Sequence, residues 1–121
     1  VDEGGKKNEI TKRIGQNYFD LGQGLQELGI TVNAAPVADL WILEAHDVIG
    51  DRAFASQPEE VANYARACAD GLGKAGVIPT VKHLPGCGRA SVDPHHELPV
   101  VRESENILMQ SDFLPFKLLA D

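Results

Sequence analysis

One segment of the chain carries most of the side chains that could do chemistry. Between positions 82 and 96 lie donors, acceptors and titratable groups of several kinds, namely Lys82, His83, Cys87, Arg89, Asp93, His95 and His96. The apolar run before them, VIPTV, predicts a buried strand, and LPGCG ends any regular element. Because polar groups are costly to bury unless they are paired or used, this strand end is a candidate active-site edge.

Asp93, Pro94 and His95 form a short unit suited to proton transfer. Pro94 fixes its own backbone torsion and biases Asp93 toward an extended conformation. A carboxylate two positions from an imidazole could hold its tautomer and support its charged form, as a general acid or base requires. The alternative is a surface turn in which Asp93 bonds to its own backbone, and the nearby Lys82 and His83 favour the functional interpretation.

Lys82 and His83 close the predicted strand, where a charge is rarely left without a partner. They either donate to hydroxyl or carboxylate groups of a ligand or, for Lys82, pair with a nearby Asp for structural reasons. Arg52 has apolar neighbours in IGDRAF, which suggests a partly buried guanidinium that meets either Asp51 or a ligand. The residues alone leave these alternatives open, and the same holds for Asp2, Asp39 and Trp41.

A metal site is a further alternative for the same segment. His83, Cys87, His95 and His96 are ligand types that suit zinc, but their spacing does not match a usual ribbon or finger. Cys87 could also be a nucleophile beside a histidine, although no flanking signature supports that role. Cys68, on the apolar face of a predicted helix, is expected to belong to the core.

Composition narrows the class of protein. The 121 residues are 43% hydrophobic and 24% charged, which is typical of a globular chain with one modest core. A net charge of -7 and a pI near 5.0 argue against a nucleic-acid-binding surface. Two cysteines cannot build a disulfide framework, and neither a secretory leader nor a long apolar run is present. These features are compatible with a reducing cytoplasm and predict no nucleic-acid partner and no membrane partner.

Alternating periodicities predict the elements that position these groups. VDEGG suits a strand end entering a tight loop, and the apolar spacing from Asn8 to Leu28 is helical. Gly29 and Gly76 suit the left-handed position after a helix. The other expected elements are a strand buried on both faces at 30–41, a long loop at 42–58, a helix at 58–74, a strand from 77, an extended or strand-like LPVV, a helix capped by Ser104, and a helix at 112–121 with Pro115 in its first turn.

This order is that of the α/β class with a parallel sheet, in which about three strands alternate with helices. Each predicted link from helix to strand is short, whereas each link from strand to helix is long and polar. In parallel α/β folds the chemistry lies at the carboxyl ends of the strands. We therefore expect the segment at 82–96 and the loop that carries Arg52 to belong to one site.

Five motifs in this order, VDEGG, APVADL, IGDRAF, KHLPGCG and DPHHELP, resemble the β-N-acetylhexosaminidase branch of glycoside hydrolase family 3. The resemblance extends through SDFLPFK and so covers essentially the whole chain. It implies a (β/α)8 barrel of the TIM type, no cofactor, and a mostly cytoplasmic enzyme. The activity it implies is removal of terminal β-linked N-acetylglucosamine from muropeptides or chitooligosaccharides during peptidoglycan recycling.

The resemblance also implies roles for individual residues. His95 would be the general acid and base, paired with Asp93 in place of the usual carboxylic acid. The sugar would be held by Asp2, Arg52, Lys82 and His83. The family usually has a histidine where this loop has Cys87, and its first motif is usually one residue longer and followed by an arginine that has no counterpart here.

Retaining hydrolysis needs a nucleophile, which in this family is an Asp on a later strand that this chain does not reach. A barrel of this type takes about 250 residues. We therefore expect residues 1–121 to form a single partial catalytic domain, with further parts of the barrel on both sides, that does not turn over by itself. The runner-up is a degenerate sugar-binding protein without catalysis, and a zinc module built on His83, Cys87 and His95 is third. The sequence does not indicate an oligomeric state.

Overall fold

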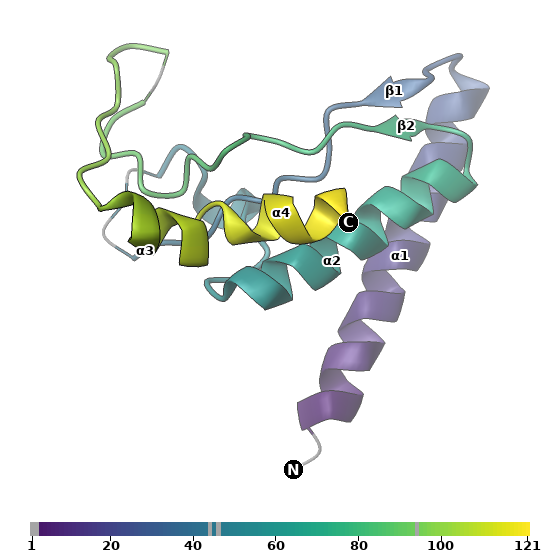
Figure 1. Ribbon diagram of the computed structural model, residues 1–121. Coiled ribbons are helices and arrows are strands. Elements are labelled where there is room, and N and C mark those ends of the chain that lie inside the picture. Colours follow the sequence, from purple (N-terminus) through teal and green to yellow (C-terminus); the bar gives the residue numbers. More distant parts are fainter. Residues whose placement is uncertain (1–2, 44, 46, 94) are drawn as a thin grey trace. The chain divides into compact units, whose positions relative to one another are not determined.

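A computed structural model describes residues 3–43, 45, 47–93 and 95–121. Two compact units make up the chain, one of Val1–Pro36 with Asn63–Val81 and the other of Val37–Ala62 with Lys82–Asp121. The elements in chain order (Figure 1) are α1 at Glu3–Glu27, β1 at Val32–Asn33, η1 at Gly50–Arg52, α2 at Pro58–Lys74, β2 at Ile78–Pro79, α3 at Glu105–Gln110 and α4 at Leu114–Ala120.

The predicted apolar face of α2 is confirmed. Its members are each at most 6% exposed, namely Val61, Tyr64, Ala65, Cys68 and Leu72. Burial raises the pKa of the Cys68 thiol to about 12, while its hydrogen bond with Tyr18 opposes that rise. The expectation that Cys68 is a core residue is therefore also confirmed.

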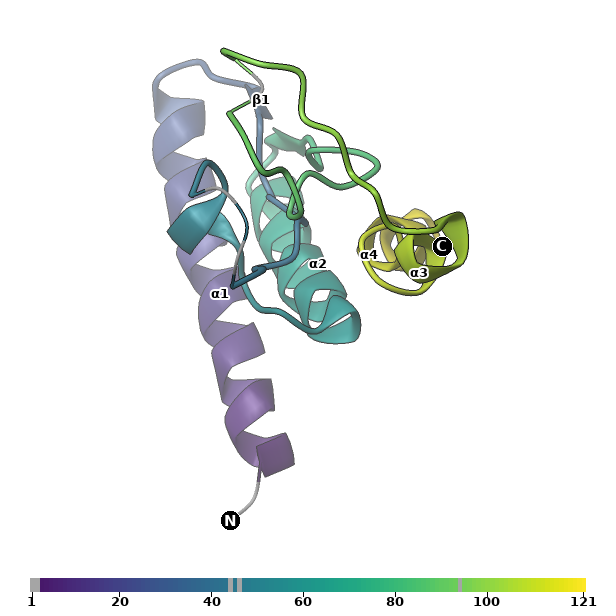
Figure 2. The same cartoon turned by 90° about the vertical axis from the view of Figure 1, so that its left-hand side faces the viewer.

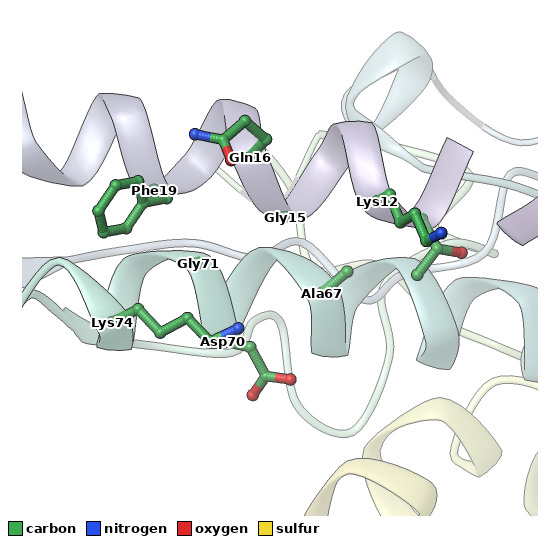
Figure 3. A pocket seen from close by; sticks show the side chains of 9 residues that line it. Lys12, Gly15, Gln16, Phe19, Ala67, Asp70, Gly71 and Lys74 are labelled. Carbon is green, nitrogen blue, oxygen red and sulfur yellow. The ribbon is translucent and has the colours of Figure 1, made fainter. Parts of the chain in front are cut away.

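Helices α1 and α2 lie side by side in the first unit, as Figures 1 and 2 both show. The approach is close at Gly71, where a Cβ atom would meet the Gly15 carbonyl oxygen and lie 3.0 Å from the Phe19 amide nitrogen. On α1, a Cβ atom at Gly22 would lie 2.6 Å from the Ala75 Cβ. Beside this contact the two helices border a groove of about 530 Å³, whose lining includes Gly15, Gly71 and Lys74 (Figure 3).

Strands β1 and β2 pair in parallel, with Val32 opposite Ile78 and Asn33 opposite Pro79. Each follows a helix through a glycine in the left-handed region, at φ +76° for Gly29 and +85° for Gly76. This confirms the predicted turns and the predicted parallel pairing. In the second unit an isolated parallel bridge joins Val37 to Lys82, and the Ala38 amide donates to the Lys82 carbonyl at 2.7 Å.

Three strand predictions were wrong. The described residues contain two short parallel strands rather than about three, and Val32 and Ile78 are 53% and 61% exposed rather than buried on both faces. Val32 and Ile78 are exposed because they belong to a sheet of only two strands, which needs further layers to cover both of its faces. Residues Glu3–Gly5 of VDEGG belong to α1, where the acidic side chain of Glu3 favours a helix start. Val1 and Asp2 lie outside the described residues.

The C-terminal elements follow the sequence more closely. Ser104 occupies the N-cap position of α3, as predicted, and its backbone carbonyl accepts from the Ile107 and Leu108 amides at 3.0 and 3.1 Å. Its side chain makes no capping hydrogen bond. Pro115 is buried in the first turn of α4, also as predicted. LPVV at 98–101 is an irregular link rather than a strand. No helix in the described ranges is both long and apolar enough to cross a membrane.

Gly71→Ala is expected to destabilise the folded chain by about 1–3 kcal/mol, because the new methyl group overlaps the backbone of α1. Chemical denaturation measures this loss. Gly73→Ala is the matched control, since nothing lies within 4 Å of a Cβ atom there. Alanine also favours the helix interior over glycine, so the control should be neutral or stabilise by up to about 1 kcal/mol. Equal effects at the two positions would contradict the close helix approach.

Candidate active site

A buried carboxylate organises the second unit. Asp39 is 0% exposed and follows the short parallel bridge at Val37. Its Oδ2 atom lies 2.6 Å from His83 Nδ1 and accepts from the His83 amide at 3.2 Å. Its Oδ1 atom accepts from the Cys87 amide at 2.6 Å. The Asp39 side chain therefore holds both His83, which directly follows the bridge residue Lys82, and the LPGCG loop.

The loop LPGCG passes close to its surroundings at two glycines. Gly86 has φ +136°, and a Cβ atom there would lie 2.9 Å from the Asp112 carbonyl oxygen. A Cβ atom at Gly88 would meet the Leu40 carbonyl oxygen. The Gly86 amide donates to the His83 carbonyl at 2.7 Å, which closes the turn. Side chains at either glycine would push the loop away from its anchor points.

A second buried carboxylate anchors the far end of this loop. Arg89 Nε donates to Asp112 Oδ2 at 2.7 Å, and Asp112 is 3% exposed. Arg89 Nη1 also lies 3.3 Å from Glu103 Oε1. The hydrogen bond to Asp112 is the main cause that raises the pKa of Arg89. These contacts fix the loop to residues on both sides of α3.

Asp93 and His95 form the pair that the sequence predicted. His95 Nδ1 lies 2.7 Å from Asp93 Oδ1, and the His95 amide donates to the same oxygen at 2.9 Å. The hydrogen bond from the His95 amide is the largest cause that lowers the pKa of Asp93, followed by the bond from the ring. The His95 side chain is 82% exposed, so its Nε2 atom is available to a ligand. Pro94, which lies between them in the sequence, is outside the described residues.

The structure agrees with the sequence prediction for Lys82 better than for Arg52. Lys82 is half-buried, and within the described ranges no carboxylate pairs with its ammonium group, so the structural ion pair is not found. The expectation of a partly buried Arg52 was wrong, because the residue is exposed and its Nη2 donates to the Val48 carbonyl. This carbonyl lies one helical turn back, where a long side chain reaches it without burial.

The structure brings the predicted residues together in two groups. Asp39 joins His83 to the LPGCG loop, and Asp93 joins His95, all within the second unit, which also holds Arg52 and Lys82. In the part of the chain that the structure describes, no three His, Cys, Asp or Glu side chains gather as metal ligands, so the zinc set is not assembled there. Burial raises the pKa of the Cys87 thiol, which disfavours the nucleophilic thiolate. Asp2 lies outside the described residues.

Sequence reasoning left Asp39 ambiguous and gave Asp112 and Arg89 no role. The signal for Asp39 was present, because it is an acidic residue at the end of an apolar run, where an uncompensated charge would be costly. The Arg89 and Asp112 pair leaves no such trace, since the two positions lie 23 residues apart and neither interrupts an apolar pattern.

The order and geometry of these motifs agree with one family. Residues 6–121 match the glycosyl hydrolase family 3 N-terminal domain. This chain belongs to that family. The resemblance drawn from the motifs is thereby confirmed, and so is the barrel class, of which the described residues supply two parallel strands.

Relatives with names point the same way. The chain is 43% identical over 100 residues to the beta-hexosaminidase LpqI of Mycobacterium tuberculosis, covering 83% of this chain and 26% of LpqI. NagZ from Neisseria gonorrhoeae is 36% identical with a TM-score of 0.86, covering 98% of this chain and 34% of that one. Zinc-bound CbsA from Thermotoga neapolitana is 35% identical with a TM-score of 0.85, covering 90% of this chain and 23% of that one. The chain thus spans about a quarter to a third of these relatives' length.

His95→Ala is expected to raise the pKa of Asp93 only part of the way to the ordinary value of 3.8, because the amide hydrogen bond remains. A lowered carboxyl pKa stabilises the folded chain above about pH 3.8, and this stabilisation is lost as the pH falls through the lowered pKa. Carbon-detected NMR titration of the Asp93 carboxyl measures the shift. His96→Ala is the control and should shift the pKa less, since only a weaker charge effect is removed. An equal or larger shift in the control would contradict the pairing.

Proposed function

We propose that this chain is part of a retaining glycoside hydrolase that removes terminal β-linked N-acetylglucosamine. The observation that carries the proposal is the pairing of His95 Nδ1 with Asp93 at 2.7 Å on an 82% exposed side chain, in a chain of glycosyl hydrolase family 3. The pairing leaves Nε2 as the reactive nitrogen, and the exposure leaves it accessible to a glycosidic oxygen.

His95 would act twice in the reaction. In the first step a carboxylate nucleophile, an Asp outside this chain, attacks the anomeric carbon while protonated Nε2 gives its proton to the departing oxygen. The glycosidic bond breaks as the bond to the carboxylate forms. In the second step Nε2 takes a proton from water, which attacks the same carbon and releases the carboxylate. Asp93 stabilises the imidazolium in the state that donates the proton.

Substrate binding would fall to residues that can bond sugar hydroxyls. Lys82 supports this role because its ammonium group has no carboxylate partner in the described ranges. His83 contributes a half-buried ring held by Asp39. The exposed Arg52 is available as a further donor. Asp2 keeps its proposed role as a carboxylate acceptor from the family resemblance.

The identity of the sugar rests on the relatives. Those reported above include a named beta-hexosaminidase, and NagZ has been solved with N-trifluoroacetyl-D-glucosamine. We extend this by proposing muropeptides or chitooligosaccharides as natural substrates, a role in peptidoglycan recycling, and a cytoplasmic location. Purified muropeptides and chitooligosaccharides offered separately to the gene's full-length product would distinguish the two substrate classes.

His95→Ala in the gene's full-length product is expected to lower kcat/KM by about 10²–10⁴-fold on an N-acetylglucosaminide with an alkyl leaving group. An aryl leaving group of low pKa needs less protonation, so the loss should be much smaller there. Release of N-acetylglucosamine and of the aryl chromophore gives the two rates. His96→Ala, next to His95 and also exposed, is the matched control and should change neither rate by more than a few-fold.

The same losses on alkyl and aryl substrates would contradict the acid role of His95. Binding of N-acetylglucosamine by the wild-type full-length product without hydrolysis would contradict the enzymatic proposal and favour a sugar-binding protein.

A further inference from the structure

We propose that Asp39 is a positioning residue that fixes the tautomer of His83, so that His83 presents an acceptor to its ligand. The ligand in question is the sugar of the proposed function, on which this second half of the inference rests. The tautomer of His83 depends only on the ring and the Asp39 carboxylate, and not on any activity.

Hydrogen-bond chemistry leaves one arrangement for a neutral ring. The Asp39 carboxylate is fully buried and surrounded by donors, with the amides of His83 and Cys87 at 3.2 and 2.6 Å. Backbone N–H groups donate to both of its oxygens, so the Asp39 carboxylate acts here as a hydrogen-bond acceptor on both sides. Nδ1 of His83, at 2.6 Å, must therefore carry the hydrogen. Nε2 then carries the lone pair.

The free nitrogen sets what the site can recognise. The His83 side chain is 36% exposed, so part of the ring is accessible while Nδ1 is engaged. A lone pair on Nε2 accepts from a hydroxyl but repels an ether or carbonyl oxygen. The neighbouring Lys82 ammonium is a donor only. Together they offer one acceptor and one donor, which suits adjacent hydroxyl groups on a sugar.

Asparagine cannot replace Asp39 in this role. Both carboxylate oxygens accept, Oδ2 from His83 and Oδ1 from Cys87. An amide would turn one of them into a donor, so either the Cys87 amide loses its acceptor or the His83 side faces an NH₂ group. In the second case the ring gains stability by moving its hydrogen to Nε2.

The test is ¹⁵N NMR of histidine side chains in the gene's full-length product at about pH 9, well above the ordinary histidine pKa of about 6.5. His83→Gln assigns the signals. The wild-type spectrum should show a protonated Nδ1 and an unprotonated Nε2 for His83. Asp39→Asn should change this pattern or mix the two tautomers. A wild-type ring protonated at Nε2 would overturn the proposal even if the variant fails to fold.

Asp112→Asn is the matched control, because Asp112 is another buried carboxylate that anchors the same loop, and its side chain has no hydrogen bond to a histidine among the described residues. It should lower stability and leave the His83 tautomer unchanged. If Asp112→Asn shifts the tautomer as much as Asp39→Asn, general loosening of the loop explains the effect and the proposal is wrong.

Ligand binding tests the second half. Asp39→Asn should weaken binding of N-acetylglucosamine by about tenfold or more, seen as a raised Kd. Sugar analogues with fluorine in place of one hydroxyl cannot donate a hydrogen bond at that position. One of these analogues should bind the wild type more weakly than the parent sugar does. In His83→Ala, the same fluorine substitution should cause no further loss of affinity. Additive losses for every analogue would overturn the acceptor role. Absence of any sugar binding with the predicted tautomer intact would instead count against the proposed function.

Discussion

The second unit depends on placing a fully buried carboxylate where three donors can reach it. Asp39 accepts from two backbone amides and one imidazole nitrogen. Burying an ionised carboxylate without such partners is prohibitive, and leaving the partners without it would strand polar groups at a strand end. The parallel bridge from Val37 to Lys82 and the Ala38 to Lys82 hydrogen bond deliver the carboxylate to this point. The hydrogen bond from the Cys87 amide to Asp39 then fixes the shape of the LPGCG loop.

A helix pair organises the first unit by a different means. Its close contact depends on Gly71 and Gly22, which let the two helix backbones approach each other. Close packing of helices thus stabilises the first unit, whereas a buried carboxylate holds the candidate site in the second unit. This division agrees with the general pattern that rigid elements carry functional loops. Every described residue of the candidate site belongs to the second unit.

Local patterns predicted the helices well, because periodicity and capping act over a few residues. The bounds of α2, its buried face and the left-handed glycines at 29 and 76 all followed from the sequence. The length and burial of the strands were overestimated. A β-branched run favours a strand, but the strand forms only where a neighbouring strand pairs with it. Asp93 and His95 were found because they lie two positions apart. Asp39 and His83 lie 44 positions apart, and no local signal could show that they meet.

The difference in sequence separation has a consequence for robustness. Asp93 reaches its histidine through its own turn, and the Asp93 carbonyl also accepts from the His96 and Glu97 amides at 3.0 Å. The loop itself therefore fixes the geometry of this hydrogen bond, whatever the position of the loop relative to the rest of the chain. The hydrogen bond between Asp39 and His83 forms only while two segments distant in the sequence are held together. Changes in the scaffold should thus disturb the contact between Asp39 and His83 before they disturb the pair of Asp93 and His95.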